Sequence, residues 1–158
     1  MTSLAHVLAA SGPGAHRWRS RRPIAEIQAE AAEIGWRCVL LDGSEIRNKE
    51  AFLEACERSY RFPAWFGHNW DALADCLADL SWLPPPAHGC GILTVFDSCD
   101  GLARSEPAAY GVVLEVWGEV AEAWRRIGVP FTVLLRESPD TADDSDASGA
   151  SDSPSDVG

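Results

Sequence analysis

The chain has 158 residues with 13 basic and 24 acidic side chains, a formal net charge of −11 at pH 7, and enough length for one domain with a hydrophobic core. Seven of the acidic residues lie at or after Glu137, which leaves 17 acidic and 13 basic residues, a net charge of −4, in residues 1–136. This moderately acidic body argues against a nucleic-acid-binding protein with a basic patch, and no apolar run approaches the roughly 20 residues of a membrane span.

Residues 1–35 are expected to form an N-terminal extension with one helix. Residues 1–21 look irregular, apart from a candidate short strand at residues 16–19. Pro23 suits the first turn of a helix, and Gly35 closes an apolar pattern of helical spacing at Ile24, Ile27, Ala31 and Ile34. We expect this helix to cover an edge or a face of a sheet. The one basic cluster is either a solvated arm or a docking site for an acidic surface, and it consists of Arg17, Arg19, Arg21 and Arg22.

Residues 36–136 alternate short apolar runs with helical patterns. The runs are typical of buried parallel strands and lie at residues 36–41, 92–96 and 131–135. Asn48 is placed to cap one helix, and Pro107 opens a long helix that ends at Gly128. This alternation predicts an α/β domain with a small parallel sheet of about three strands packed with helices. The acidic tail, residues 137–158, has too few apolar side chains to bury, and we predict that it is disordered.

The cysteines indicate a reducing compartment. They are five in number, an odd count, and none of them forms a C-x-x-C pair. This pattern favours buried, reduced thiols over disulfides, and the close ligand spacing of a zinc site is missing. The N-terminus lacks the apolar core of a secretory signal peptide, so we expect a cytoplasmic protein.

The stretch FPAWFGHNWDALADCLADL, residues 62–80, carries the most distinctive chemistry. Pro63 and Gly67 mark a loop, and Gly67 is expected to supply a backbone geometry closed to other residues. Asn69 is a good N-cap for a helix over about residues 70–80, whose apolar stripe is Trp70, Leu73, Leu77 and Leu80. The loop also carries Trp65 and Phe66, and we expect both aromatic rings to be incompletely buried.

Another face of this helix carries Asp71, Asp75 and Asp79 at i, i+4 and i+8. Like charges at this spacing oppose helix formation by roughly 0.2–0.5 kcal/mol per pair, and only Asp71 gains from the helix dipole. The ladder therefore indicates a site for an external cation, which is a metal, a lysine or an arginine. Together with the loop aromatics, it predicts a surface that binds something positively charged.

At these residues the chain resembles a known family. The pattern Pro63-x-x-Phe66-Gly67-x-Asn69-x-Asp71-Ala72-Leu73-x-Asp75-Cys76-Leu77 is similar to the central loop and second helix of the barstar-type ribonuclease inhibitors, and Leu41-Asp42-Gly43 fits the same family. The resemblance covers about residues 36–136. It implies a small α/β protein without catalytic activity, cofactor or metal, which blocks the active site of a guanyl-specific ribonuclease with its acidic helix and the preceding loop. Such a bacterial inhibitor serves self-protection or immunity, as an antitoxin does.

The resemblance also implies which residues face the partner. They are Trp65, Phe66, Gly67, His68, Asn69, Asp71, Ala74, Asp75, Ala78, Asp79 and Glu122, with Asp75 as the key carboxylate. Three positions depart from the family's namesake, which has tyrosine at Trp65, tryptophan at Ala74 and glutamate at Ala123. Glu122 or Glu119 is expected to replace that missing glutamate, as an imperfect substitute. The expected partner is a basic ribonuclease or a related toxin, with no nucleic acid and no membrane, and the free inhibitor is expected to be a monomer.

Two alternatives stay open. One is a barstar-like module whose partner is not a ribonuclease. The other is a carboxylate metalloenzyme, although neither a phosphate-binding glycine loop nor a nucleophile elbow accompanies the aspartates. Asp97 and Asp100 fit a turn and a helix cap better than a metal site, and His68 fits a rim contact better than a catalytic base.

Overall fold

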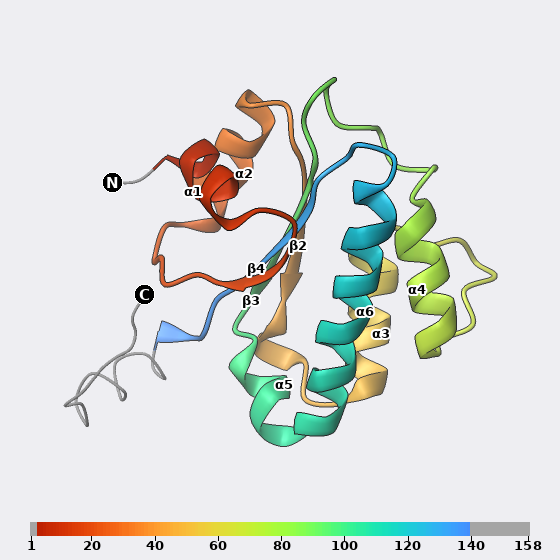
Figure 1. Ribbon diagram of the computed structural model, residues 1–158. Helices are drawn as coiled ribbons and strands as arrows, with labels where there is room; N and C mark the ends of the chain where they lie inside the picture. Colours follow the sequence, from red (N-terminus) through yellow and green to blue (C-terminus); the bar gives the residue numbers. More distant parts are fainter. Residues whose placement is uncertain (1–2, 140–158) are drawn as a thin grey trace.

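The structure, a computed structural model, describes residues 3–139 and has a four-stranded parallel sheet at its centre (Figure 1). The strands are β1 (Gly14–Arg17), β2 (Arg37–Asp42), β3 (Ile92–Asp97) and β4 (Phe131–Leu135), in the order β1-β4-β3-β2. The predicted α/β fold and its three buried strands are confirmed, and β1 adds a fourth strand to the expected three. The predicted disordered tail lies outside the described residues from Asp140 onward.

The pleat of the central strands divides the core into two clusters. Along β3, Ile92 and Phe96 join the cluster on one face of the sheet, whereas Leu93 and Val95 join the cluster on the other. Successive side chains of a strand point to opposite faces, so a strand with both faces covered is apolar throughout. This is the reason why the short apolar runs of the sequence predicted buried strands correctly.

Two helices of the N-terminal extension, α1 (Leu4–Ser11) and α2 (Ile24–Glu33), cover one face of the sheet (Figure 1). The helix predicted after Pro23 is α2, and Ile27 and Ala31 are its buried residues. The expectations of a single helix and of an otherwise irregular stretch over residues 1–21 are wrong, because α1 is a second helix, whereas the candidate strand at residues 16–19 corresponds to β1, which begins two residues earlier. The missed signal of α1 is the Ser3 side chain, which accepts a hydrogen bond of 3.2 Å from the amide of His6 as a helix cap.

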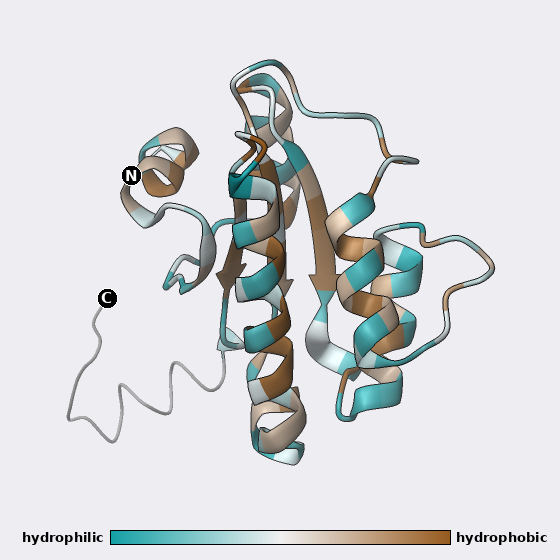
Figure 2. Ribbon diagram, turned by 45° about the vertical axis from the view of Figure 1, so that its right-hand side comes forward, coloured by the Kyte–Doolittle hydropathy of each residue, from teal (hydrophilic) through white to brown (hydrophobic). Residues whose placement is uncertain are grey.

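The opposite face is covered by α3 (Lys49–Ser59), α4 (Trp70–Asp79) and α6 (Pro107–Arg125), as the two views of Figures 1 and 2 show. Asn48 caps α3 as predicted, with its Oδ1 accepting from the amide of Ala51 at 2.8 Å. Trp117 of α6 is fully buried against Phe52 and Phe96, with ring centroids 5.7 and 5.8 Å away. These rings form the centre of the larger cluster, on which α4 rests through Leu73 and Leu77.

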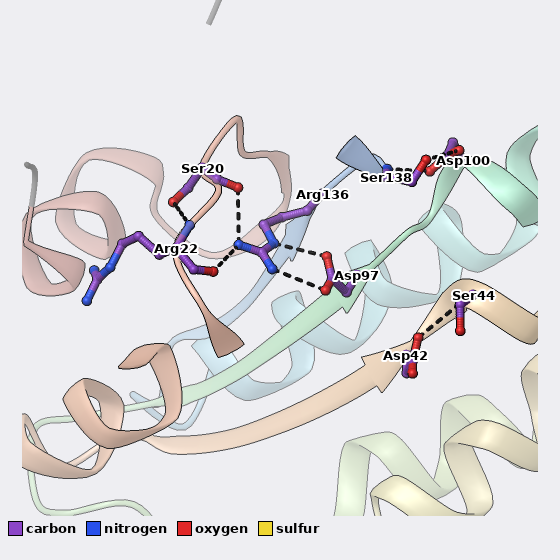
Figure 3. Close-up of polar contacts among 8 residues, drawn as sticks. All are labelled: Ser20, Arg22, Asp42, Ser44, Asp97, Asp100, Arg136 and Ser138. Carbon is purple, nitrogen blue, oxygen red and sulfur yellow. Dashed lines mark hydrogen bonds and ion pairs between the residues drawn. The ribbon is translucent and has the colours of Figure 1, made fainter. Parts of the chain in front are cut away.

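The carboxyl end of the sheet is closed by the 3-10 helix η1 (Gly43–Glu45), by α5 (Asp100–Ser105) and by the segment after β4 (Figure 3). Asp97 accepts two hydrogen bonds from Arg136, from Nε at 3.0 Å and Nη2 at 3.1 Å. Asp100 accepts from the amide of Ser138 at 2.7 Å. Asp100 is the first residue of α5, whose N-cap is Cys99 without a capping side-chain bond, so the predicted capping role of Asp97 and Asp100 is wrong.

The cysteines are free thiols in the described part of the chain. Cys56, Cys76 and Cys99 are buried, whereas Cys38 and Cys90 are half-buried. Burial raises the pKa of the Cys38 and Cys99 thiols to about 11. Among residues 3–139, no helix is long and apolar enough to cross a membrane, and no group of three or more His, Cys, Asp or Glu side chains is arranged to hold a metal ion.

Candidate functional site

The predicted acidic ladder lies on the exposed face of α4. Asp71, Asp75 and Asp79 are all exposed, and none of them forms an ion pair with another residue in the described range 3–139. Burial raises the pKa of the Cys76 thiol behind them, and the charges of Asp75 and Asp79 raise it further. Three unneutralised carboxylates spaced one helical turn apart can bind a row of cationic groups from outside the chain.

Asn69 positions this helix as predicted. Its Oδ1 accepts from the amide of Ala72 at 2.8 Å, and its Nδ2 donates to the carbonyl of Gly67 at 3.3 Å. The other end of α4 is held by Trp124 of α6, whose indole Nε1 donates to the carbonyl of Leu77 at 2.8 Å. Because the last-turn carbonyls of a helix lack partners within it, this bond from α6 satisfies one of them and ties the two helices together.

The loop before α4 is anchored by aromatic packing. Phe66 is 4% exposed, and its ring lies 4.8 Å from that of Phe62, which in turn stacks on Tyr60. The expectation that Phe66 is incompletely buried is wrong, because its ring joins the larger core cluster and packs on the rings of Phe62 and His68. Trp65, by contrast, is 69% exposed as expected. The buried ring anchors the loop, and its neighbour is presented to solvent.

The unusual backbone geometry of this loop occurs at His68 and not at Gly67. His68 has φ 53°, in the left-handed region, whereas Gly67 is absent from the positive-φ residues. His68 is stabilised there by contacts on two sides: its Nε2 lies 2.8 Å from Oε1 of Glu57, and its ring lies 4.7 Å from that of Phe66. The expectation for Gly67 is therefore wrong, and His68 contributes to the shape of the loop.

Three of the expected contact residues are less available than the sequence indicated. Phe66 is buried, and Ala74 is half-buried against the core. Glu122 lies on α6, where Arg125 donates to both of its carboxylate oxygens at 2.9 and 2.5 Å and Arg126 lies at 3.7 Å. The hydrogen bond with Arg125 lowers the pKa of the Glu122 carboxyl group. An incoming cation must therefore compete with two arginines of the same helix for Glu122.

The remaining expected residues form one exposed surface on the loop and α4. They are Trp65, Gly67, His68, Asn69, Asp71, Asp75, Ala78 and Asp79. Sequence reasoning missed the contacts that support this surface, namely the Glu57–His68 pair and the position of the Lys49 ammonium 5.2 Å from the centre of the Trp70 ring. Each of these pairs joins α3 to the loop or to α4, and no spacing rule within one helix points to such a pair.

Trp70 and Trp65 are expected to differ in their effect on stability. Trp70 is half-buried and lies 6.5 Å from the ring of Phe52, so Trp70→Ala should lower the free energy of unfolding by roughly 2 kcal/mol, less than for a fully buried ring. Trp65→Ala should change it by no more than about 0.5 kcal/mol. Urea denaturation of both variants measures the difference. Equal losses in the free energy of unfolding would show that the assignment of Trp70 to the core and of Trp65 to the exposed surface is wrong.

Comparisons with known proteins give a family match over most of the chain and a likeness of fold. Residues 36–136 match the family described as Barstar (barnase inhibitor), a range that contains the loop, α4 and Glu122. A search of curated proteins found no match. A solved structure of the Aeropyrum pernix ORC2 protein, in ADPNP–ADP complexes, is similar at 17% identity with a TM-score of 0.52; the match covers 89% of this chain and 39% of that chain. At this identity the likeness concerns the fold alone.

Proposed function

Since the chain belongs to the barstar (barnase inhibitor) family, we propose that it inhibits a basic, guanyl-specific ribonuclease by covering the active site of that enzyme with α4 and the loop before it. In this proposal the protein itself carries out no catalysis and needs no cofactor. It acts as a monomer inside the cell that produces it, for self-protection or for immunity to a related toxin. The observation that carries the proposal is the row of three exposed carboxylates on α4, which have no ion-pair partner among residues 3–139.

Charge complementarity supports a ribonuclease as the partner. An enzyme that cleaves RNA holds cationic side chains where the phosphates of its substrate bind. Carboxylates one turn apart on a helix can take the place of those phosphates and accept charge-assisted hydrogen bonds from arginine and lysine. Opposite charges on the two surfaces also accelerate the diffusional encounter, and this acceleration falls as the salt concentration rises.

The anchored loop supports the same proposal through its rigidity. Phe66 and His68 are fixed by their contacts, so the backbone of the loop that carries the exposed Trp65 is anchored before the partner arrives. An anchored loop loses little backbone entropy on binding, and tryptophan is among the residues that contribute most to protein interfaces.

Inhibition of RNA cleavage tests the proposal. A guanyl-specific ribonuclease from the same host, or one isolated from it with the tagged chain, is assayed on a fluorogenic RNA with increasing amounts of the chain. We expect complete inhibition at equimolar ratio, and its loss in the triple variant Asp71→Asn/Asp75→Asn/Asp79→Asn. The matched control, Glu26→Gln/Glu33→Gln on α2, changes exposed acids on the opposite face of the sheet and should inhibit like the wild type.

A second candidate is a partner that is not a ribonuclease, and two departures from the family's pattern favour it. Ala74 offers little side chain to a partner, and the carboxylate of Glu122 is already bound by Arg125 and Arg126. If the host ribonucleases stay active while the tagged chain captures another basic protein through Asp75, the ribonuclease proposal is wrong and this candidate takes its place.

A further inference from the structure

A cavity of about 650 Å³ lies at the end of the molecule where α4 and α6 both end (Figure 1). Its walls come from the linker between α4 and β3, residues 80–91, and from the end of α6 with the turn after it, residues 124–129. Asp79, the last residue of α4, also lines the cavity. The cavity therefore continues the acidic surface of α4 past the end of that helix.

The linker is held in place along its length, although it forms neither a helix nor a strand. Nε of Arg37 donates to the carbonyl of Pro84 at 3.0 Å, and the amide of Ala87 donates to the carbonyl of Gly35 at 2.8 Å. The three consecutive prolines at residues 84–86 restrict the backbone further, because each ring fixes its own φ. The wall of the cavity thus exists before any partner binds, which lowers the entropy cost of binding.

The lining of the cavity is mostly apolar. Leu80 and Ile92 are buried there, and Leu83 and Trp124 are half-buried. Concave sites with apolar walls and a few polar groups are the usual places where a protein binds an apolar group from outside. Filling this cavity with such a group removes apolar surface from water on both sides of the contact.

Ile127 gives the cavity an exposed apolar residue. It is 67% exposed, and among residues 3–139 the one other large hydrophobic residue with such exposure is Trp65. Trp65 precedes α4 in the loop, whereas Ile127 shares the cavity with Asp79 at the other end of the helix. Helix α4 has 10 residues, and a helix of this length spans about 15 Å. The acidic row therefore has an exposed apolar residue near each of its ends.

The charged side chains at the cavity indicate what an occupant carries. Asp79 is exposed and forms no ion pair within residues 3–139, and Asp75 lies one turn before it. Arg37 is half-buried, and its guanidinium holds the linker through Pro84. His88 also lines the cavity and is exposed. An apolar group with a cation beside it fits this arrangement, because the cation pairs with Asp79.

We propose that the cavity receives an aliphatic or aromatic side chain that lies next to a lysine or arginine on the surface of the basic partner, an inference that rests on the proposed function. The apolar side chain displaces water from the apolar wall, and the neighbouring cation pairs with Asp79. A row of carboxylates alone attracts any polycation. The cavity adds the requirement for an apolar side chain at a set distance from the cations, and it thereby distinguishes one basic ribonuclease from another.

Two substitutions at Ile127 test the inference in the RNA-cleavage assay, with the same ribonuclease as for the triple aspartate variant. Ile127→Ser removes apolar contact without adding a charge, and it should raise the inhibition constant about tenfold. Ile127→Lys also repels the cation of the partner and should raise the constant further. Because Ile127 is exposed, both variants should fold. The matched controls Ala29→Ser and Ala29→Lys, at an exposed position of α2, should inhibit like the wild type.

Small peptides probe the cavity without the ribonuclease. N-acetyl-leucyl-arginine amide is titrated into the full-length chain, and nuclear magnetic resonance follows the Trp124 indole N–H and the methyl groups of Ile127. We expect saturable shifts of both signals. N-acetyl-glycyl-arginine amide lacks the apolar side chain and N-acetyl-leucyl-glutamate amide reverses the charge, so each should bind about tenfold more weakly. In Ile127→Lys the shift of the Trp124 signal should be lost.

The outcomes distinguish this inference from the proposed function. If the wild type inhibits no guanyl-specific ribonuclease, the proposed function is wrong and this inference fails with it. If the wild type inhibits and Ile127→Ser inhibits equally well, the cavity is not occupied in the complex and this inference alone is wrong. Equal affinities of the leucyl-arginine peptide and either of the other two peptides would also overturn it.

Discussion

Asp75→Ala is expected to weaken binding to the cognate ribonuclease by about 2–5 kcal/mol and to leave the free chain as stable as the wild type or slightly more stable. Asp75 lies in the middle of α4, exposed and without an ion-pair partner in the described range. Its removal relieves the repulsion with Asp71 and Asp79 one turn away on either side. Within the part of the chain that the structure describes, no hydrogen bond or ion pair of the Asp75 carboxylate is lost in exchange.

In the complex the same change has the opposite effect. The carboxylate is proposed to neutralise cations of the enzyme that become desolvated on binding. Without it those cations are buried unpaired, so dissociation accelerates more than association slows. A loss of about 2–5 kcal/mol is typical when one partner of a buried charge pair is removed from a protein interface; the complex of the family's namesake is among the known examples, so this magnitude is carried over from the family and depends on the proposed contact.

Binding kinetics and thermal melts of Asp75→Ala and Asp79→Ala measure these effects. Asp79 is the last residue of α4 and lies farthest from the loop, so Asp79→Ala should cost less and act mainly on the salt-dependent association rate. If the Asp75→Ala variant is unfolded, Asp75 has a structural role. Unchanged binding of a folded Asp75→Ala would exclude α4 as the recognition surface.

Arg136→Met is expected to lower the free energy of unfolding by roughly 2–4 kcal/mol, the largest stability loss predicted here. The Arg136 side chain is 8% exposed and makes four hydrogen bonds, two to Asp97 and one each to the carbonyls of Ser20 and Arg22. Methionine keeps much of the volume and leaves all these acceptors without their donor. Asp97 is 27% exposed, so water can recover part of the loss.

Urea denaturation of Arg136→Met, Asp97→Asn and the double variant measures this coupling. Because the double variant leaves no unpaired charge, we expect it to be more stable than the sum of the two single losses indicates. Additive losses would show that Arg136 acts mainly through its hydrogen bonds to the carbonyls of Ser20 and Arg22. A loss below about 0.5 kcal/mol for Arg136→Met would show that the pair contributes no more than an exposed ion pair does.

Local signals allowed much of the fold to be predicted. The apolar runs at residues 36–41, 92–96 and 131–135 are strands because a strand covered on both faces must be apolar at every position. Asn48 and Asn69 mark the starts of α3 and α4 because their side chains reach amides only three residues ahead. Such contacts depend on neighbours in sequence and are visible without the fold.

The candidate site was predicted only in part. The exposure of Asp71, Asp75 and Asp79 follows from helical periodicity, since Leu73 and Leu77 occupy the buried face. The positive φ of His68 does not follow from its residue type, and glycine was the natural expectation. The pairing of Glu122 with its own arginines was open to prediction from their i+3 and i+4 spacing on α6.

The α/β class, the positions of the central strands and the acidic face of α4 follow from the amino-acid sequence alone, because periodicity and capping act within a few residues. The fold was needed to show that Phe66 is buried while Trp65 is exposed, because Phe66 joins a core cluster built from several helices and strands. The same holds for β1, which enters the sheet because β4, more than one hundred residues later, offers it an edge. Burial and pairing depend on surfaces that meet only after the chain has folded, and no local pattern contains them.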